Sequence, residues 1–527
     1  MAVKFIFVTG GVVSGLGKGI TVASIGRLLK ARGLRVTMQK LDPYINISPG
    51  RMSPIQHGEV FITDDGAETD LDIGHYERFA DESLTRNANT SAGRIYWNVI
   101  SSERAGKYGG GTVQIIPHIT DAIKEKIYSV ADESKTDVVI TEIGGTVGDI
   151  ESRAFLEAIR QVASDVGREN CLYVQVALIP YLNASGELKT KPVQHSVKEL
   201  LSVGIQPDVL VCRTELPLPE DVKAKIGLFC NISGNAVIQN ITAPTIYEIP
   251  LIFEQEGLPK IICDKLSIKC GEPDLKEWRE LVDTFKYPDN GETTIAIVGK
   301  DAELHDSYLS VCESLLHAGI AHSCRVNIRW IDAHDLNEQN ADELLKGVDG
   351  IVSPGGFGAD GADGQIVASE YARAHDIAFL GIGLGTEMAV LGFARNACGL
   401  KDADSVEFDA STSCDVVFEP AKEGDDPMKR GAMQTKLEKG TKLFDIYKEE
   451  IISERHWHRY EINPKYFDAL EKGGLVISGK SVCGGYADTI ELPGHRFFVG
   501  VIFHPQFKSR PNRPHKLIKE FVGACLK

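Results

Sequence analysis

Short runs of β-branched and other apolar residues alternate with longer amphipathic stretches along the first half of the chain. The first run, Phe5 to Val8, is followed by apolar positions at helical spacing from Ile20 to Leu29 and by a second run from Arg35 to Met38. Further short runs lie at residues 138–141, 173–178 and 209–212. This alternation predicts βαβ units, and therefore a parallel sheet with helices on both faces.

The same alternation returns after a polar interruption at residues 267–292, which contains the turn-forming string Cys270-Gly271-Glu272-Pro273. New apolar runs then lie at residues 294–299, 326–331, 350–353 and 378–382. A chain of 527 residues exceeds what one hydrophobic core usually spans. We therefore predict two α/β domains in tandem, 1–266 and 293–527, joined by a linker at 267–292.

Composition excludes several classes of protein. No apolar run approaches the ~18 residues of a membrane span, and the N-terminal run is too short for a signal sequence. The 11 cysteines show neither a CxxC pair nor metal-ligand spacing, so we expect free thiols and a cytoplasmic location. The formal net charge of −17 argues against general binding of nucleic acid, because phosphate backbones repel such a surface.

A glycine-rich segment, Thr9 to Gly19, lies between the first apolar run and the first helical pattern. Its glycines allow backbone N–H groups to surround phosphate oxygens, and Lys18 supplies a mobile positive charge. The segment departs from the pattern GxxxxGK[ST], since Val12 replaces the first glycine and Gly19 replaces the magnesium-binding Ser or Thr. We interpret it as a nucleotide-phosphate loop formed by Ser14, Gly15, Leu16, Gly17, Lys18 and Gly19.

Carboxylates elsewhere must bind magnesium if Gly19 cannot. Asp72 ends the acidic string Glu68-Thr69-Asp70-Leu71-Asp72, and Glu142 follows the predicted strand at 138–141. Acidic residues at the carboxyl ends of parallel strands face the crevice where ligands bind, and magnesium takes one or two carboxylates beside phosphate oxygens. Asp72 and Glu142 are therefore the candidate metal ligands. For each, a solvated loop carboxylate is the alternative.

Two further segments suit a second nucleotide. Lys189 and Lys191 are two residues apart, so in an extended stretch both point the same way. Lys225 is a candidate third cation, and Asp149-Ile150-Glu151 offers acceptors to a base or ribose. A solvated surface pair is the alternative for the two lysines.

These motifs, with four longer strings in the same order, resemble the CTP synthase family over the whole first half. Besides the loop at residues 9–19, the four strings lie at residues 40–46, 56–60, 144–151 and 186–192. The resemblance implies amination of UTP at C4: ATP phosphorylates the uracil O4, ammonia attacks, and phosphate leaves. It implies that Ser14 to Gly19 bind ATP, with Lys18 and Lys40 as catalytic residues, and that Asp72 and Glu142 bind Mg²⁺.

The resemblance also implies the site for UTP and for CTP as feedback inhibitor. That site comprises Ser14, Asp149, Ile150, Glu151, Lys189, Thr190, Lys191, Pro192, Val193, Gln194 and Lys225. It further implies a homotetramer, possible filaments, and GTP as an activator of the glutamine-dependent step.

The second half resembles a class I glutamine amidotransferase domain, which supplies ammonia in this family. The glutamine-binding positions are Gly356, Leu384, Glu387, Glu407 and Arg459. However, the family's G-I-C-L-G turn reads Gly381-Ile382-Gly383-Leu384-Gly385, and its H-P-E motif reads His504-Pro505-Gln506. Gly383 carries no nucleophile, and the Gln506 amide cannot stabilise an imidazolium as a carboxylate does.

Other positions depart from the family as well. The arginine of its G-x-R-G loop is Asp360, and the first half has Arg51, Ala105, Lys107 and Gly109 at altered positions. We expect an amidoligase that works with free ammonia, with an impaired or absent glutaminase. GTP activation and the source of ammonia stay open. A non-catalytic paralogue that binds nucleotides beside a competent partner, and a different P-loop ligase, are the alternatives.

Overall fold

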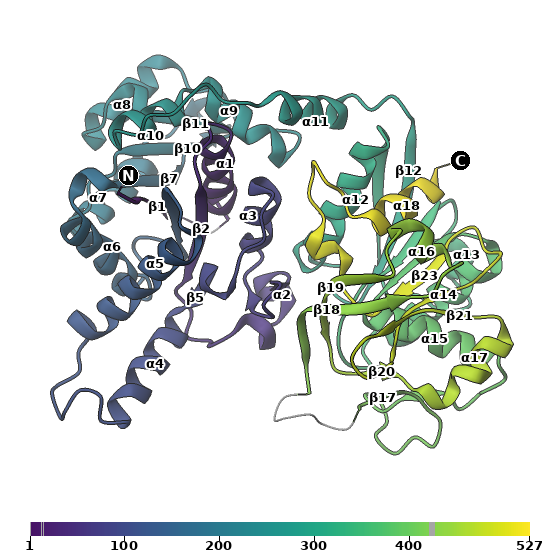
Figure 1. The fold of residues 1–527 in the computed structure, drawn as a ribbon. Helices are drawn as coiled ribbons and strands as arrows, with labels where there is room; N and C mark the ends of the chain where they lie inside the picture. The colour runs from purple at the N-terminus through teal and green to yellow at the C-terminus, as the bar shows by residue number, and fades with distance from the viewer. Residues whose placement is uncertain (1, 12, 14, 421–426, 527) are drawn as a thin grey trace. The chain divides into compact units, whose positions relative to one another are not determined.

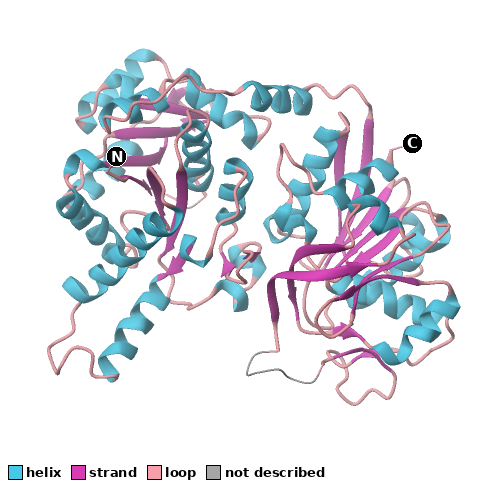
Figure 2. Ribbon diagram, in the orientation of Figure 1, coloured by secondary structure: helices cyan, strands magenta, loops and turns pink. Residues whose placement is uncertain are grey.

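The predicted strands of the first half all form, and they lie in one parallel sheet of order β11-β10-β7-β1-β6-β2-β5 (Figures 1 and 2). The computed structural model describes residues 2–11, 13, 15–420 and 427–526. The strands are β1 (Lys4–Gly10), β2 (Val36–Asp42), β5 (Asn89–Ser91), β6 (Val138–Ile143), β7 (Cys171–Leu178), β10 (Val209–Thr214) and β11 (Val237–Ile241).

Helices cover both faces of this sheet, which explains why strand β1 is buried at every position. On one face Phe5 and Phe7 pack with Phe155 and neighbouring apolar residues. On the other, Gly26 of α1 lies so close to Met38 that a Cβ built there would be 2.6 Å from its sulfur. The helices are α1 (Lys18–Lys30), α3 (Asp72–Ala80), α4 (Ala92–Arg104), α5 (Thr120–Ser134), α6 (Arg153–Val166), α7 (Lys191–Ser202), α8 (Glu220–Cys230), α9 (Ile249–Gln255), α10 (Leu258–Lys265) and α11 (Lys276–Lys286).

The second half contains a nine-stranded mixed sheet of order β13-β12-β14-β15-β23-β22-β21-β18-β19. Its first five strands are parallel and include all four that the sequence predicts, and the remaining strands pair antiparallel. The strands are β12 (Glu292–Gly299), β13 (Arg325–Asp332), β14 (Gly350–Ser353), β15 (Ala378–Ile382), β18 (Lys429–Leu437), β19 (Ile451–His458), β21 (Val476–Ser481), β22 (Ala487–Glu491) and β23 (Phe498–Val501).

Alternate residues of β12 enter two different cores, which shows that this sheet is also covered on both faces. Ile295 and Ile297 pack with residues of α12 and α18, whereas Ala296 and Val298 pack with residues of α14 and α15. A small sheet of β16 (Asp404–Ser405), β17 (Asp415–Phe418) and β20 (Glu461–Ile462) lies beside them. The helices are α12 (Leu309–Ala321), α13 (Ala341–Leu344), α14 (Ala362–His375), α15 (Leu384–Asn396), α16 (Lys442–Tyr447), α17 (Phe467–Gly473) and α18 (Lys516–Cys525).

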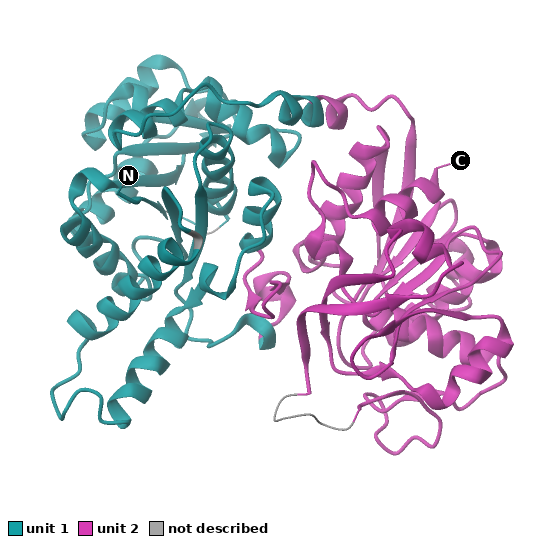
Figure 3. Cartoon of the chain, in the orientation of Figure 1, with its two compact units in different colours: residues 1–51, 72–282 teal, residues 52–71, 283–527 magenta. Residues whose placement is uncertain are grey.

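The chain divides into two compact units that do not follow the sequence order: 1–51 with 72–282, and 52–71 with 283–527 (Figure 3). The segment 52–71 holds α2 (Pro54–His57), β3 (Phe61–Ile62) and β4 (Glu68–Thr69). Its Glu59 accepts a hydrogen bond from Ser310 N at 2.6 Å, and Asp64 pairs with the buried Arg455 at 2.7 Å. These contacts make the segment an integral part of the second unit.

Two further observations concern the boundary between the units and the cysteines of the chain. Helix α11 spans the point at which the units divide, within the predicted linker. The expectation of free thiols is wrong for one pair, since Cys263 and Cys270 form a disulfide, while nine described cysteines are free. Among the described residues, no helix is long and apolar enough to cross a membrane.

Candidate functional site

The predicted phosphate loop joins strand β1 to helix α1, and its backbone requires glycine. Gly15 and Gly17 have φ of +72° and +82°, in the region that disfavours residues with a side chain. Lys18 begins the helix, is 8% exposed, and donates to the carbonyl of Gly145 at 2.9 Å. Its side chain passes over Gly10, where a Cβ would lie 2.6 Å from Lys18 Cδ. Ser14 lies outside the described residues.

Gly19 and Asp72 share one space. A Cβ built on Gly19 would lie 1.9 Å from Asp72 Oδ1, so the carboxylate occupies the volume that a Ser or Thr would fill. Lys40 pairs with the same carboxylate at 2.5 Å. Burial works to raise the pKa of Asp72, but Lys40, His75 and Lys18 outweigh it and hold that pKa below its ordinary value. The structure thus brings Asp72 to the position from which the usual loop residue binds magnesium.

Glu142 lies beside Lys40 in the sheet, as its register partner on β6. Burial, reinforced by the negative charge of Asp72, raises the pKa of Glu142 to about 7. Tyr76 of helix α3 donates a hydrogen bond from its phenolic hydroxyl to the Glu142 carboxylate. The buried Glu142 and the partly buried Asp72, which repel one another beside a phosphate loop, match what Mg²⁺ needs, together with phosphate oxygens.

In the described chain no three His, Cys, Asp or Glu side chains gather in a group able to hold a metal ion. The Asp72 and Glu142 pair therefore fits an ion that completes its shell with phosphate and water, rather than one held by a protein cage.

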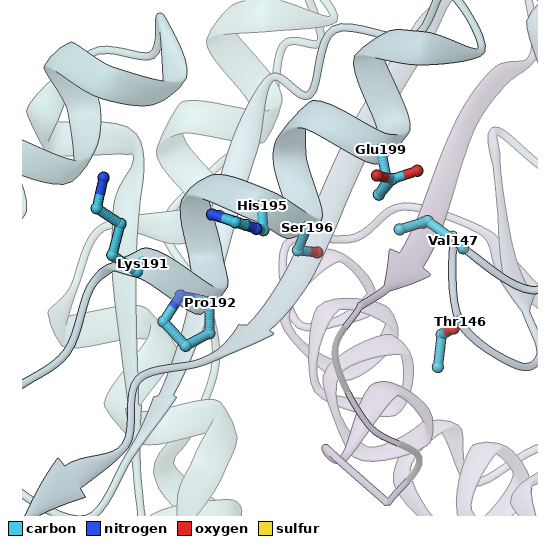
Figure 4. A pocket seen from close by; sticks show the side chains of 8 residues that line it. Thr146, Val147, Lys191, Pro192, His195, Ser196 and Glu199 are labelled. Atoms are coloured by element: carbon cyan, nitrogen blue, oxygen red, sulfur yellow. The ribbon is translucent and has the colours of Figure 1, made fainter.

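A cavity of about 530 Å³ lies between the loop after β6 and the first turns of α7 (Figure 4). Its volume is in the range that holds a nucleotide-sized ligand. Two predicted residues, Lys191 and Pro192, line it. The other lining residues were not predicted: Thr146, Val147, Gly148, His195, Ser196 and Glu199.

The interpretation of Lys189 to Lys191 as an extended stretch is wrong. Strand β9 (Glu187–Leu188) ends before Lys189, and helix α7 begins at Lys191. Thr190, at the helix N-cap, has helical φ and ψ of −87° and −9°, so the two lysines do not share the side of a strand. Thr190, Val193 and Gln194 are buried, and Gln194 Nε2 donates to Thr190 Oγ1 at 3.2 Å. These three residues build the helix start rather than a surface open to solvent.

The remaining residues predicted for UTP lie on exposed loops and one helix. Asp149 accepts a hydrogen bond from Thr146 N at 2.8 Å and so closes its own loop, while Ile150 is 79% exposed. Lys189 pairs with Glu187, and this contact lowers the pKa of Glu187, with smaller contributions from Ser185 and from the charge of Lys225. A shared anion site of Lys189 and Lys225 stays a prediction.

The turn after β15 in the second unit keeps the shape of a nucleophile elbow. Gly383 has φ +52° and ψ −120°, caps helix α15, and donates its N–H to Val501 O at 2.8 Å. A Cβ built on Gly383 would lie 3.3 Å from His504 Nε2. The backbone thus points a missing side chain at the histidine of the predicted triad.

His504 is buried, and burial lowers its pKa to about 3. Gln506 Nε2 lies 2.9 Å from His504 Nδ1, so an amide occupies the place of the family's orienting carboxylate. His504 Nε2 has no hydrogen-bond partner within the described parts of the chain. The imidazole therefore faces Gly383, which has no side chain, and an amide rather than a carboxylate lies beside its other nitrogen.

The predicted glutamine-binding positions surround this elbow. A Cβ on Gly356 would lie 3.4 Å from Leu384 Cδ2, and Glu407 accepts the N–H of Gly358 at 2.7 Å. Burial raises the pKa of Glu407, against the opposing effects of Gly358, Lys300 and Arg459. Burial also raises the pKa of Glu387 well above its ordinary value, and the charges of Glu407 and Glu461 add to this. Burial therefore raises the pKa of both carboxyls at the predicted glutamine-binding positions, and their binding role stays a prediction.

Comparison with known proteins fits this two-part geometry. Residues 4–268 match the family model "CTP synthase N-terminus", and residues 303–524 match "Glutamine amidotransferase class-I". The chain is 57% identical to a CTP synthase of Ruminiclostridium cellulolyticum, covering 100% of this chain and 99% of that one. It is 58% identical to a CTP synthase of Carboxydothermus hydrogenoformans, covering 99% of both. The chain belongs to the CTP synthase family.

CTP synthases are ligases of pyrimidine biosynthesis that convert UTP to CTP with ATP, and both parts of the family architecture are present here. A solved structure described as "Trypanosoma brucei CTPS - glutaminase domain with bound acivicin" is 38% identical over 44% of this chain and 93% of that chain, with a TM-score of 0.42. Gly383 and Gln506 lie in a chain that matches these two CTP synthases over 99% or more of its length.

Several residues of this CTP synthase escaped prediction although their signals were present. His195, Ser196 and Glu199 follow Lys191 and Pro192 at intervals of four residues, which puts them on one helix face. Prediction of the helix from Lys191 would have found them. Tyr76 follows Asp72 by four residues on α3 and reaches Glu142 for the same reason.

Proposed function

We propose that this chain aminates UTP to CTP with ATP and free ammonia, and that it does not obtain ammonia from glutamine by itself. The observation that carries the proposal is the elbow at Gly383, which keeps its backbone geometry and faces His504 but has no thiol. The Gln506 amide beside His504 supports it independently.

The first unit retains the groups that phosphoryl transfer needs. Lys18 and Lys40 would stabilise charge on the phosphate being transferred from ATP to the uracil O4, because positioning and electrostatics supply most of such catalysis. Asp72 and Glu142 would hold Mg²⁺, which when bound neutralises phosphate charge. Lys189, Lys191 and Lys225 would bind the phosphates of UTP, and CTP would occupy the same region as product and inhibitor.

Purified protein tests the proposal directly. With UTP, ATP and Mg²⁺, we expect CTP from ammonium chloride and none above background from glutamine. A comparable rate from glutamine alone would refute the missing glutaminase. Nucleotide binding without CTP formation at saturating ammonium would favour the non-catalytic paralogue instead. Size-exclusion chromatography with light scattering tests the homotetramer that family resemblance implies, and a titration with GTP tests activation.

A further inference from the structure

Three buried polar side chains connect the phosphate-loop strand to the cavity of Figure 4. Thr9 on β1 and Gln175 on β7 are register partners in the sheet, and Ser196 on α7 lines the cavity. Their exposed fractions are 1%, 0% and 4%. None of the three belongs to the residues assigned above to ATP, UTP or magnesium.

The direction of these hydrogen bonds determines where the Ser196 proton points. The Thr9 hydroxyl donates to Gln175 Oε1, its shorter contact, with Val174 O farther away at 3.3 Å. The amide nitrogen of Gln175 therefore faces Ser196 and donates to Oγ at 2.6 Å. An amide N–H₂ group can only donate, so Ser196 is the acceptor and its own proton stays available.

The Ser196 hydroxyl makes no other hydrogen bond within the described residues. A serine inside a helix commonly donates to the carbonyl four residues earlier, and that contact is absent for this described residue. A Cβ built on Gly11 would lie 1.8 Å from Ser196 Oγ. The free donor thus lies where the phosphate loop meets the cavity.

We propose that Ser196 is a UTP-binding residue whose hydroxyl donates a hydrogen bond to an oxygen of the nucleotide in this cavity. The inference rests on the proposed function, because it takes UTP as the occupant. Phosphate, ribose and uracil carbonyl oxygens of UTP are all acceptors, which matches a site where a buried hydroxyl has its proton available to donate. Lys191 at the helix start supplies positive charge on the same cavity wall.

Calorimetric titration of the full chain with UTP tests the proposal without requiring turnover. Ser196→Ala should weaken UTP binding by roughly tenfold to a hundredfold, the usual effect of losing a hydrogen bond to a charged or strongly polar group. Ser202→Ala is the matched control on the same helix, since its hydroxyl is exposed and donates only to Glu199 O. It should bind UTP as the wild type does.

A second variant separates binding from stability. Gln175→Glu places an acceptor opposite Ser196, so the serine proton turns toward residue 175 and away from the cavity. Thr9, residue 175 and Ser196 each keep a hydrogen-bond partner, yet UTP binding should fall as it does in Ser196→Ala. A thermal melt should show that Gln175→Glu remains folded.

The outcomes are distinct. If the wild type binds no UTP, both the proposed function and this inference fail. If the wild type binds UTP and Ser196→Ala or Gln175→Glu binds it equally well, only this inference fails. If the variants lose affinity for the ATP analogue AMP-PNP but not for UTP, the assignment to UTP is overturned.

Discussion

A strand that turns through a glycine into a helix occurs in each unit, and the two turns differ in the side chain that they present. In the first, strand β1 turns through Gly17 at φ +82° into α1 and presents Lys18. In the second, β15 turns through Gly383 at φ +52° into α15, and the residue at the turn has no side chain. Both turns keep their geometry, because the backbone is fixed by parallel strands and buried helices rather than by the functional side chain. A preserved fold therefore does not show preserved chemistry.

The two turns also differ in how a missing side chain is replaced. At Gly19 the empty volume is filled by the carboxylate of Asp72, which is itself a metal-binding group. At Gly383 the atoms nearest to a built Cβ belong to His504 and Gly355, at 3.3 to 3.5 Å. In the proposed function, Asp72 takes the metal-binding role that Gly19 cannot fill, whereas the nucleophile missing at Gly383 is not replaced.

The largest expected effect comes from restoring the second turn. In Gly383→Cys with Gln506→Glu, the thiol faces His504 Nε2 and the carboxylate can hold the imidazolium. We expect glutamine hydrolysis to rise by on the order of 10³-fold or more, because members of such a triad act as a unit. Glutamate release and glutamine-dependent CTP formation are the measurements.

The matched control for this variant is Gly383→Ala with Gln506→Glu. It carries the same backbone strain from a side chain at positive φ, but no nucleophile. Equal glutamine hydrolysis in both variants, or none in either, would mean that the elbow has lost more than its side chain.

Removing the charge from the first turn should have the next largest effect. Lys18→Ala deletes the cation that faces the transferred phosphate, and we expect ammonium-dependent CTP formation to fall by about 10²- to 10³-fold. Lys30→Ala, at the other end of the same helix, is the control, since Lys30 pairs with Glu82 away from the loop. A loss below tenfold in Lys18→Ala would leave the phosphate loop without its proposed role.

Most of the parallel strands in both sheets were predictable from sequence, because buried parallel strands leave a strong apolar signal, but the strand order was not predicted. The antiparallel strands β18 to β22 were not predicted, since strands such as β18 (Lys429–Leu437) alternate buried and exposed positions and contain charged residues. The assignment of residues 52–71 to the second unit was also beyond reach. It depends on long-range pairs such as Asp64 with Arg455, which no local pattern shows.

Within the sites, prediction succeeded for residues in glycine-rich or acidic strings and failed where helical periodicity mattered. Because residues 189–191 were predicted as an extended stretch, the helix that carries His195, Ser196 and Glu199 was not predicted. The disulfide of Cys263 with Cys270 was missed because spacing alone does not show which side chains meet.

A smaller effect tests whether Glu142 depends on its support from α3. Tyr76→Phe removes the hydroxyl that donates to the carboxylate and leaves the ring packed. We expect about tenfold weaker metal binding, as is usual when a residue that orients a metal ligand is lost. Mn²⁺ binding in the presence of AMP-PNP, followed by electron paramagnetic resonance, measures this independently of turnover. Unchanged Mn²⁺ affinity in Tyr76→Phe would show that Glu142 needs no such support.

The smallest expected effect concerns two buried carboxyls with raised pKa values, Glu142 beside the proposed metal site and Asp488 away from it. Burial raises the pKa of Asp488, in the second unit, to about 7. In the unfolded chain the same carboxyl has a pKa of 3.8. Between about pH 4 and 7, therefore, only the unfolded state loses this proton, and stability falls as pH rises. Asp488→Asn should remove that fall and raise the melting temperature at pH 8 by about 2–4 °C. Mg²⁺ with ATP should leave this difference unchanged, because no phosphate site adjoins Asp488 in the proposed arrangement, whereas it should offset the corresponding cost at Glu142.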